Sequence, residues 1–125
     1  MRKFLLSALI AWPISAGQPS PEKWYEADYV VANCKGQIEF ALSDGTSVDC
    51  VTATHAIEFD YDKKWAEALG QALFYSAMTG KRAGIVLIIS PSTKSRYLNR
   101  LDLAIESHKL EVDVFTVERR KTGTD

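Results

Sequence analysis

The feature that most restricts the fold of this sequence is a continuous apolar run, GIVLII, at residues 84–89. A strand that is apolar on both faces has to be covered on both faces, as are the central strands of parallel sheets. A helix is expected next, over about 94–108 with Leu98, Leu101 and Ile105 on one side, and an alternating strand over 111–117 follows it. Strand, helix and strand form a right-handed βαβ unit, so the sequence predicts an α/β fold.

Three shorter strands are expected before the apolar run. Residues 37–42 alternate, the turn Ser43-Asp44-Gly45 returns the chain, and residues 46–52 and 55–61 complete a three-strand meander. A helix that begins after Pro21 and ends near Ala32 precedes the meander. A second helix is expected over 63–79, with Asp62 as its N-cap and Gly80 after its end. The predicted order is therefore α-βββ-α-β-α-β, with a mixed sheet.

Acidic side chains converge within this plan. Strand residues alternate between faces, so Glu58 and Asp60 point the same way on the third strand, and Asp49 lies on the strand before it. On the following helix, Lys64, Gln71 and Tyr75 are spaced three or four residues apart along one stripe. These side chains form either a chemical site or the solvated face of a meander, since both place acids on one side of a sheet.

The N-terminus has the layout of a secretory signal peptide over residues 1–17: Arg2 and Lys3, an apolar run, then Pro13 and small residues. The apolar run is about half the length of a bilayer span, so we do not expect a permanent transmembrane helix, and an uncleaved anchor is an open alternative. We therefore expect a periplasmic or secreted protein with one domain over 18–118 and a polar tail over 119–125. The alternative is a buried N-terminal helix. The whole chain has 15 basic and 16 acidic residues, a balance that does not indicate a nucleic-acid binder.

The two cysteines, Cys34 and Cys50, agree with export. In an oxidising compartment an even pair in a small domain is expected to form a disulfide, and two buried thiols are the alternative. A bridge would close the loop between them and so add about 3 kcal/mol of stability on the chain-entropy estimate.

The predicted element order resembles the PD-(D/E)XK nuclease superfamily, which has a restriction-endonuclease-like αβββαβ core. Asp49 and Glu58 match the two acids of that pattern, and Gln71-Ala-Leu-Phe-Tyr75 resembles the QxxxY element of its exonuclease-like branch. Asp60 stands where the family has lysine, and Lys64 is the natural substitute, with Lys63 second. The chain also resembles small, exported, uncharacterised bacterial proteins with a VDCxTxTHAIEFD segment followed by KWAEAxGQALxYA.

This resemblance implies a metal-dependent nuclease that cleaves phosphodiester bonds with Mg²⁺ as cofactor and nucleic acid as partner. Asp49, Glu58 and Asp60 would be metal ligands, with Glu39 as a further candidate. Lys64 would orient or deprotonate water, and Gln71 and Tyr75 would position the phosphate. The alternative function is a non-catalytic envelope binding or structural protein on the same fold, whose protein partner the sequence does not identify. His55 shares a face with Ile57 and Phe59, so it is expected to be a satisfied core or rim histidine rather than a zinc ligand.

Overall fold

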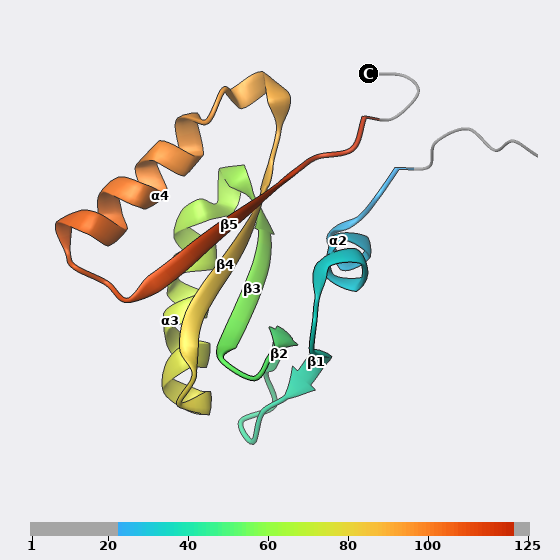
Figure 1. Cartoon of the computed structure of the whole chain (residues 1–125), viewed down its shortest axis with the longest axis vertical. Coiled ribbons are helices and arrows are strands. Elements are labelled where there is room, and N and C mark those ends of the chain that lie inside the picture. Colours follow the sequence, from blue (N-terminus) through green and yellow to red (C-terminus); the bar gives the residue numbers. More distant parts are fainter. Residues whose placement is uncertain (1–22, 122–125) are drawn as a thin grey trace, which may run out of the picture.

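The computed structural model describes residues 23–121, and within them the chain forms one five-stranded mixed sheet with helices on both faces (Figure 1). The strands lie in the order β1-β2-β3-β4-β5. The elements are α2 (Glu26–Asn33), β1 (Gln37–Ala41), β2 (Ser47–Val51), β3 (His55–Tyr61), the 3-10 turn η1 (Asp62–Lys64), α3 (Trp65–Thr79), β4 (Arg82–Ile89), the 3-10 turn η2 (Pro91–Thr93), α4 (Arg96–Ser107) and β5 (Val112–Glu118).

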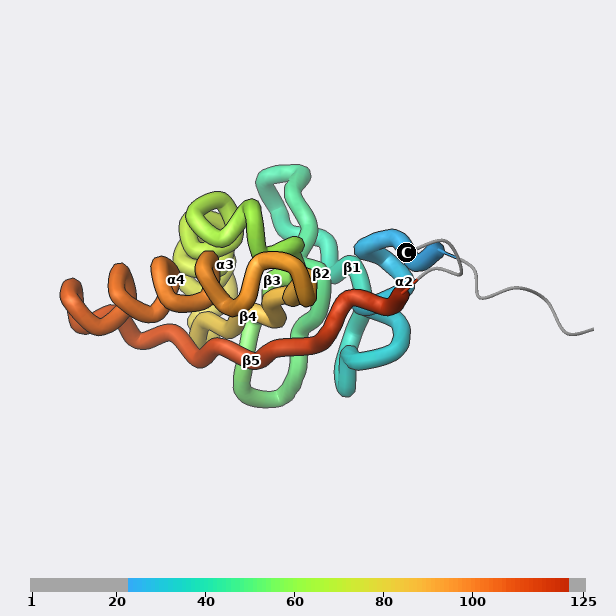
Figure 2. The backbone as a smooth tube through the Cα atoms, turned by 90° about the horizontal axis from the view of Figure 1, so that it is seen from above, coloured from blue at the N-terminus to red at the C-terminus, as the bar shows by residue number. Residues whose placement is uncertain are grey.

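The sheet joins an antiparallel meander to a parallel unit, as predicted. β1, β2 and β3 pair antiparallel, whereas β3, β4 and β5 pair parallel. The helices α3 and α4 are the crossovers that connect the parallel strands. These two helices cover one face, and α2 packs on the other (Figure 2). The predicted α/β fold and its element order are confirmed.

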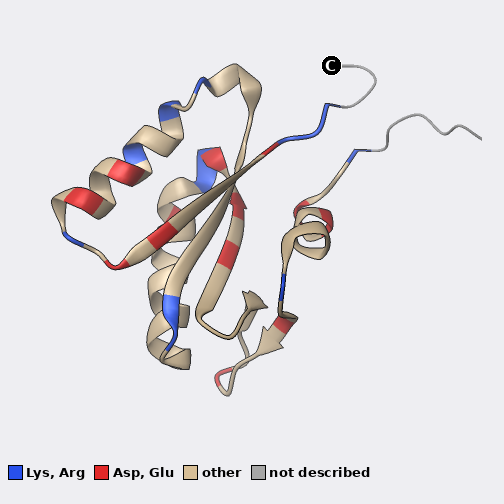
Figure 3. Ribbon diagram, in the orientation of Figure 1, with Lys and Arg blue, Asp and Glu red and all other residues tan. Residues whose placement is uncertain are grey.

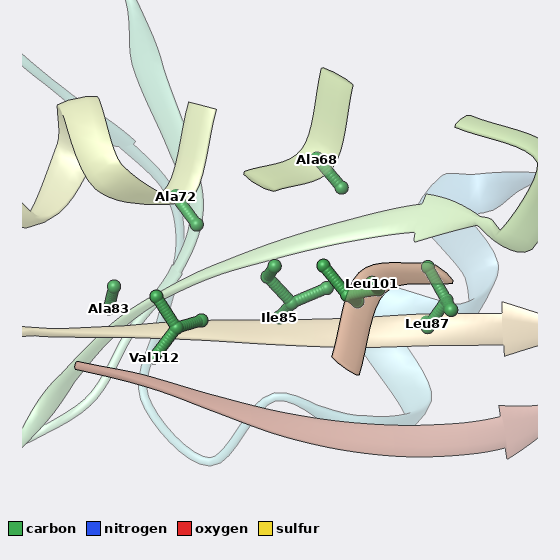
Figure 4. Close-up of a cluster of buried hydrophobic side chains, with 7 residues drawn as sticks. All are labelled: Ala68, Ala72, Ala83, Ile85, Leu87, Leu101 and Val112. Atoms are coloured by element: carbon green, nitrogen blue, oxygen red, sulfur yellow. The ribbon is translucent and has the colours of Figure 1, made fainter. Parts of the chain in front are cut away.

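The apolar run forms the interior strand β4, and both of its faces are buried. Ala83, Ile85 and Leu87 point toward the α3 and α4 side, where they meet a cluster of buried side chains from those helices and from β5 (Figure 4). Val86 and Ile88 point the other way, into the cluster under α2. A strand between two apolar layers has no wet side, which explains why this segment does not alternate.

β2 and β3 stay paired only at their shared end. Their register joins Cys50 to Ile57 and Val51 to Ala56, and no further pair follows. Beyond this point α2 lies beside β3 in place of β2 (Figure 1). The second half of β3 is therefore flanked by a strand on one side and by a helix on the other, and this opening positions the candidate site.

The predicted disulfide between Cys34 and Cys50 is present. Cys34 follows directly after α2 and Cys50 is fully buried on β2, so the bridge fixes the end of the helix to the meander. Gly36 allows the approach that this needs, because a Cβ there would lie 2.0 Å from the carbonyl oxygen of Val51. The bridge is consistent with an oxidising compartment.

The start of α3 differs from the prediction. Asp62 is not the N-cap: it begins a 3-10 turn, and Lys64 precedes the first residue of α3 without a side-chain cap bond. The Asp62 side chain is buried, and its Oδ2 accepts hydrogen bonds from the Ser90 backbone N–H at 3.1 Å and from the Thr93 hydroxyl at 2.6 Å. The Asp62 carboxylate therefore holds the loop after β4 by hydrogen bonds and does not cap the helix.

Two predictions fall wholly or partly outside the described residues. The signal peptide at 1–17 and the proposed helix start at Pro21 lie before residue 23, while the described helix α2 begins at Glu26 with Tyr25 as N-cap. Within residues 23–121, none of the helices combines the length and the apolarity that a membrane crossing demands.

Candidate active site

The site centres on Glu58 and Asp60, which are consecutive on one face of β3. Both side chains are buried, with 7% and 5% of their residue surface exposed. Glu58 also has a buried carboxyl oxygen, Oε2, that has no hydrogen-bond partner. Native proteins rarely leave a buried polar atom without a partner, so this oxygen points to a missing proton donor or ligand.

Asp49 completes a pair with Glu58 where β2 leaves β3. One Asp49 oxygen, Oδ2, accepts a hydrogen bond of 2.8 Å from the Phe59 backbone N–H, which has lost its neighbouring strand. Burial is the main cause that raises the pKa of Glu58 to about 9, and the nearby Asp49 carboxylate adds to it by its charge and by accepting a hydrogen bond from protonated Glu58. The pair therefore holds a proton at neutral pH.

A second acid pair lies beside the first and joins β3 to α2. Burial raises the pKa of Glu26 to about 7, and the charge of Asp60 and a hydrogen bond to it raise it further. Burial also raises the pKa of Asp60, and the nearby Lys64 ammonium opposes that shift. Figure 3 shows the acidic segments of β3 and of the start of α2 on neighbouring elements.

Glu26 is the site residue that the sequence analysis missed. It lies three and four residues before Tyr29 and Val30, which are the buried side chains of α2, so it shares their face of the helix. That spacing is visible in the sequence. What the sequence does not show is that this face of α2 lies against β3 and not against solvent.

The remaining predicted residues surround the two pairs to different degrees. Glu39 is exposed on β1, but it is close enough to raise the pKa of Asp49, although burial is the larger cause. Tyr75 is buried on α3, and burial raises its phenol pKa, to which Glu58 and Asp49 add. Within the described part of the chain, the Gln71 side chain makes no hydrogen bond. The structure thus brings Asp49, Glu58 and Tyr75 together, and it groups Asp60 with Lys64 and Glu26.

The carboxylate donors meet part of what a divalent cation requires. Every donor is a carboxylate oxygen, which suits hard cations such as Mg²⁺, and Oε2 of Glu58 is a buried acceptor without a partner. Among residues 23–121, however, no group of three or more His, Cys, Asp or Glu side chains has the arrangement of a metal site. The chemistry of the donors therefore fits, while the carboxyl groups are engaged with one another as acid pairs.

A basic surface, which we call the cationic hollow, adjoins the acid pairs. It has a volume of about 370 Å³ and shares Lys64 with the site. Arg119 links it to a second hollow of about 380 Å³ formed by the loop after β4 and the segment after β5. Figure 3 shows the basic segments where β3 runs into α3 and along the chain after β5. The basic residues of the two hollows are Lys23, Lys63, Lys64, Arg119, Arg120 and Lys121.

Aromatic rings lie among these cations. The Arg119 guanidinium is 5.4 Å from the centre of the Tyr61 ring, and the Lys23 ammonium is 5.6 Å from that of Tyr25. The Tyr25 ring is also largely exposed, at 66%. On surfaces of this type, the bases of single-stranded nucleic acids stack on the exposed rings, and the cations neutralise the phosphates.

No family model, no curated protein and no solved structure matches this chain. The resemblance to the PD-(D/E)XK superfamily therefore stays a prediction, and the function has to be argued from the geometry of the acid pairs and their surroundings.

Proposed function

We propose that this protein is an exported, divalent-cation-dependent nuclease that hydrolyses phosphodiester bonds at the acid pairs. The observation that carries the proposal is the buried Glu58 carboxyl, whose Oε2 has no partner although Asp49 is its neighbour. A group buried in this way is costly unless something binds it, and a bound cation would offset the repulsion between two neighbouring carboxylates.

Asp49 and Glu58 would hold the cation, and Asp60 is the next carboxylate on the same face. When bound, such a cation supplies an activated water and neutralises charge on the phosphate. Because the Asp49–Glu58 pair retains a proton at neutral pH without a cation, binding has to displace that proton, and cation affinity is expected to rise with pH up to the range in which Glu58 ionises.

The other residues bind and orient the substrate. Lys64 interacts with the charges of both Glu26 and Asp60, so its ammonium lies at the border between the acid pairs and the cationic hollow. A phosphate lying there would meet the ammonium as negative charge develops on its oxygens. Tyr75, close to Glu58, can donate a hydrogen bond because its raised pKa keeps the phenol protonated. The hollow would hold the flanking strand through its cations and rings.

Cation binding is tested by calorimetry with Mg²⁺ and Mn²⁺ in buffers of different ionisation enthalpy at neutral pH. We expect binding accompanied by the release of about one proton from the Asp49–Glu58 pair. Glu58→Gln should abolish binding, whereas Glu106→Gln, an exposed acid on α4, should bind like the wild type. The absence of any heat, or heat that survives Glu58→Gln, would remove the cation from the proposal.

Cleavage is tested on single- and double-stranded DNA and RNA with the mature protein and Mg²⁺. Lys64→Ala should lose cleavage but keep cation binding, because its role begins only when charge develops on the phosphate. Lys109→Ala is the control, because Lys109 is an exposed lysine after α4 that does not line the cationic hollow, and this variant should cut normally. If instead Lys63→Ala is inactive and Lys64→Ala is active, the two roles are exchanged.

The second candidate function is a non-catalytic envelope protein on the same fold. It is favoured by Asp60, which occupies the position of the family lysine, and by the acids being engaged in pairs without a three-ligand arrangement among residues 23–121. Wild-type protein that neither binds Mg²⁺ or Mn²⁺ nor cuts any nucleic acid would favour this candidate over the nuclease.

A further inference from the structure

His55 belongs to a hydrogen-bonded chain on the face of β3 opposite to Glu58 and Asp60. The Arg82 guanidinium contacts both Asp113 oxygens, with Nε 2.6 Å from Oδ2 and a terminal nitrogen 3.1 Å from Oδ1. The same Oδ2 lies 2.7 Å from His55 Nε2, and His55 Nδ1 lies 2.7 Å from the Thr54 hydroxyl. With Nε2 donating to the carboxylate, Nδ1 accepts from the hydroxyl, so the ring is fixed at both ends. The predicted satisfied histidine is confirmed.

Beside this histidine the sheet carries a pocket of about 470 Å³ on the face where α2 packs. The volume lies in the range of small-molecule sites. Its apolar wall includes the buried Val86 of β4 and the exposed ring of Phe115 on β5, which meets the His55 ring edge to face with centres 6.1 Å apart. Its polar end is formed by Asn33, Lys35, Thr52, Thr54 and His55.

The pocket exists because α2 stops short of it. α2 ends at Asn33, so the first halves of β3, β4 and β5 have no helix over them on this face (Figure 1). Gly84 then lies beneath His55 without a side chain, where a Cβ would come within 3.1 Å of Ile57 Cγ1 and 3.4 Å of His55 Cδ2. The side chains of Ile57 and His55 thus lie over Gly84, and the pocket walls are held by the hydrogen-bonded histidine and by packed strands.

The charges around the pocket have one sign. Lys35 contributes an ammonium, and no Asp or Glu lines the pocket. The nearest carboxylate, Asp113, is already neutralised by Arg82, and this contact and the one to His55 lower its pKa to about 2. An apolar wall with a cation at the polar end matches an amphipathic anion, while it disfavours a cationic ligand.

We propose that this pocket binds a small carboxylate with a flat apolar body. The apolar body would lie against Val86 and Phe115, and the carboxylate would face Lys35 and the threonine hydroxyls. The site is separate from the acid pairs, which lie at the opening between β2 and β3, so it adds a ligand to the protein independently of any nuclease activity.

The test is a titration of the mature protein with phenylacetate, followed by amide chemical shifts. For a ligand of this size we expect a dissociation constant on the order of millimolar, with the largest shifts at Thr54, His55, Ile57 and Phe115. Phenylacetamide, the neutral analogue of the same shape, should bind about threefold to fivefold more weakly, as expected for one exposed ion pair.

Two variants assign the contacts. Lys35→Gln should remove the preference for phenylacetate over phenylacetamide, and Lys109→Gln, an exposed lysine after α4, should preserve it. Val86→Phe should block both compounds, with unfolding curves used to show that the variant is folded. Equal binding of the two compounds by the wild type, no binding at all, or shifts centred on Lys63 and Arg119 in the cationic hollow would overturn the proposal.

Discussion

Replacing Glu58 by Gln should change the pH dependence of folding stability. The pKa of Glu58 is about 9 in the folded protein, against 4.5 for an ordinary glutamate, so between these values the folded state binds one proton more than the unfolded state. The free energy of unfolding then decreases as pH rises, by up to about 1.4 kcal/mol per pH unit. This loss of stability is absent below the unfolded pKa of 4.5 and complete above the folded pKa of about 9.

Other shifted groups do not reverse this slope. Glu26, with a pKa raised to about 7, acts in the same direction. Asp113, whose pKa is lowered to about 2, contributes stability that is lost only in acid. From pH 5.5 to 7.5 the Glu58 proton alone therefore costs the wild type about 3 kcal/mol. Glu58→Gln is neutral in both states and should escape that loss.

The assay is urea unfolding at pH 5.5, 6.5 and 7.5 in the presence of EDTA. Glu58→Gln should be more stable than the wild type by about 1.4 kcal/mol at pH 5.5 and by about 4 kcal/mol at pH 7.5. The difference of about 3 kcal/mol between the two pH values corresponds to about 12 °C or more in Tm for a domain of this size. Glu106→Gln, exposed on α4, should follow the wild-type curve. A Glu58→Gln variant with the wild-type slope would refute the assignment of the retained proton to Glu58.

Two further predictions concern the contacts that hold the site in place. Replacing Cys34 and Cys50 together by Ala should lower the free energy of unfolding by about 3 kcal/mol, because the bridge joins residues 16 positions apart. Denaturant midpoints measured with and without reductant check this. A wild-type midpoint that reductant leaves unchanged would contradict it. Asp62→Ala should cost about 2 kcal/mol, since it leaves the Ser90 amide and the Thr93 hydroxyl without their acceptor. Asp62→Asn should cost less, and faster exchange of the Ser90 amide should accompany the Ala variant; unchanged exchange would argue against the contact.

The fold could be predicted because its signals are local. The alternation that places Glu58 and Asp60 on one face needs only neighbouring residues, and β3 has the predicted bounds. The apolar run predicted a strand that is covered on both faces, and β4 is an interior strand between β3 and β5. Cys34 and Cys50 could be paired because no other cysteine competes.

The site was predicted less completely because it depends on long-range packing. Asp49 and Glu58 could be placed together from strand parity, but Glu26 reaches Asp60 only because α2 replaces β2 beside β3. Asp62 has the residue type and position of an N-cap, yet its hydrogen-bond partners lie 28 and 31 residues later. A single sequence carries no local signal for either contact.

The two ends of the described chain are fastened to each other. The Arg120 backbone N–H donates to the Tyr29 hydroxyl across 91 residues, and the Arg120 guanidinium lies 4.3 Å from the centre of the Trp24 ring. Closing so long a loop is entropically expensive and slow compared with forming hairpins or helices. During synthesis, which runs from the N-terminus, α2 cannot make this contact until residue 120 has left the ribosome, so the helix that carries Glu26 is fully docked only when the chain is nearly complete.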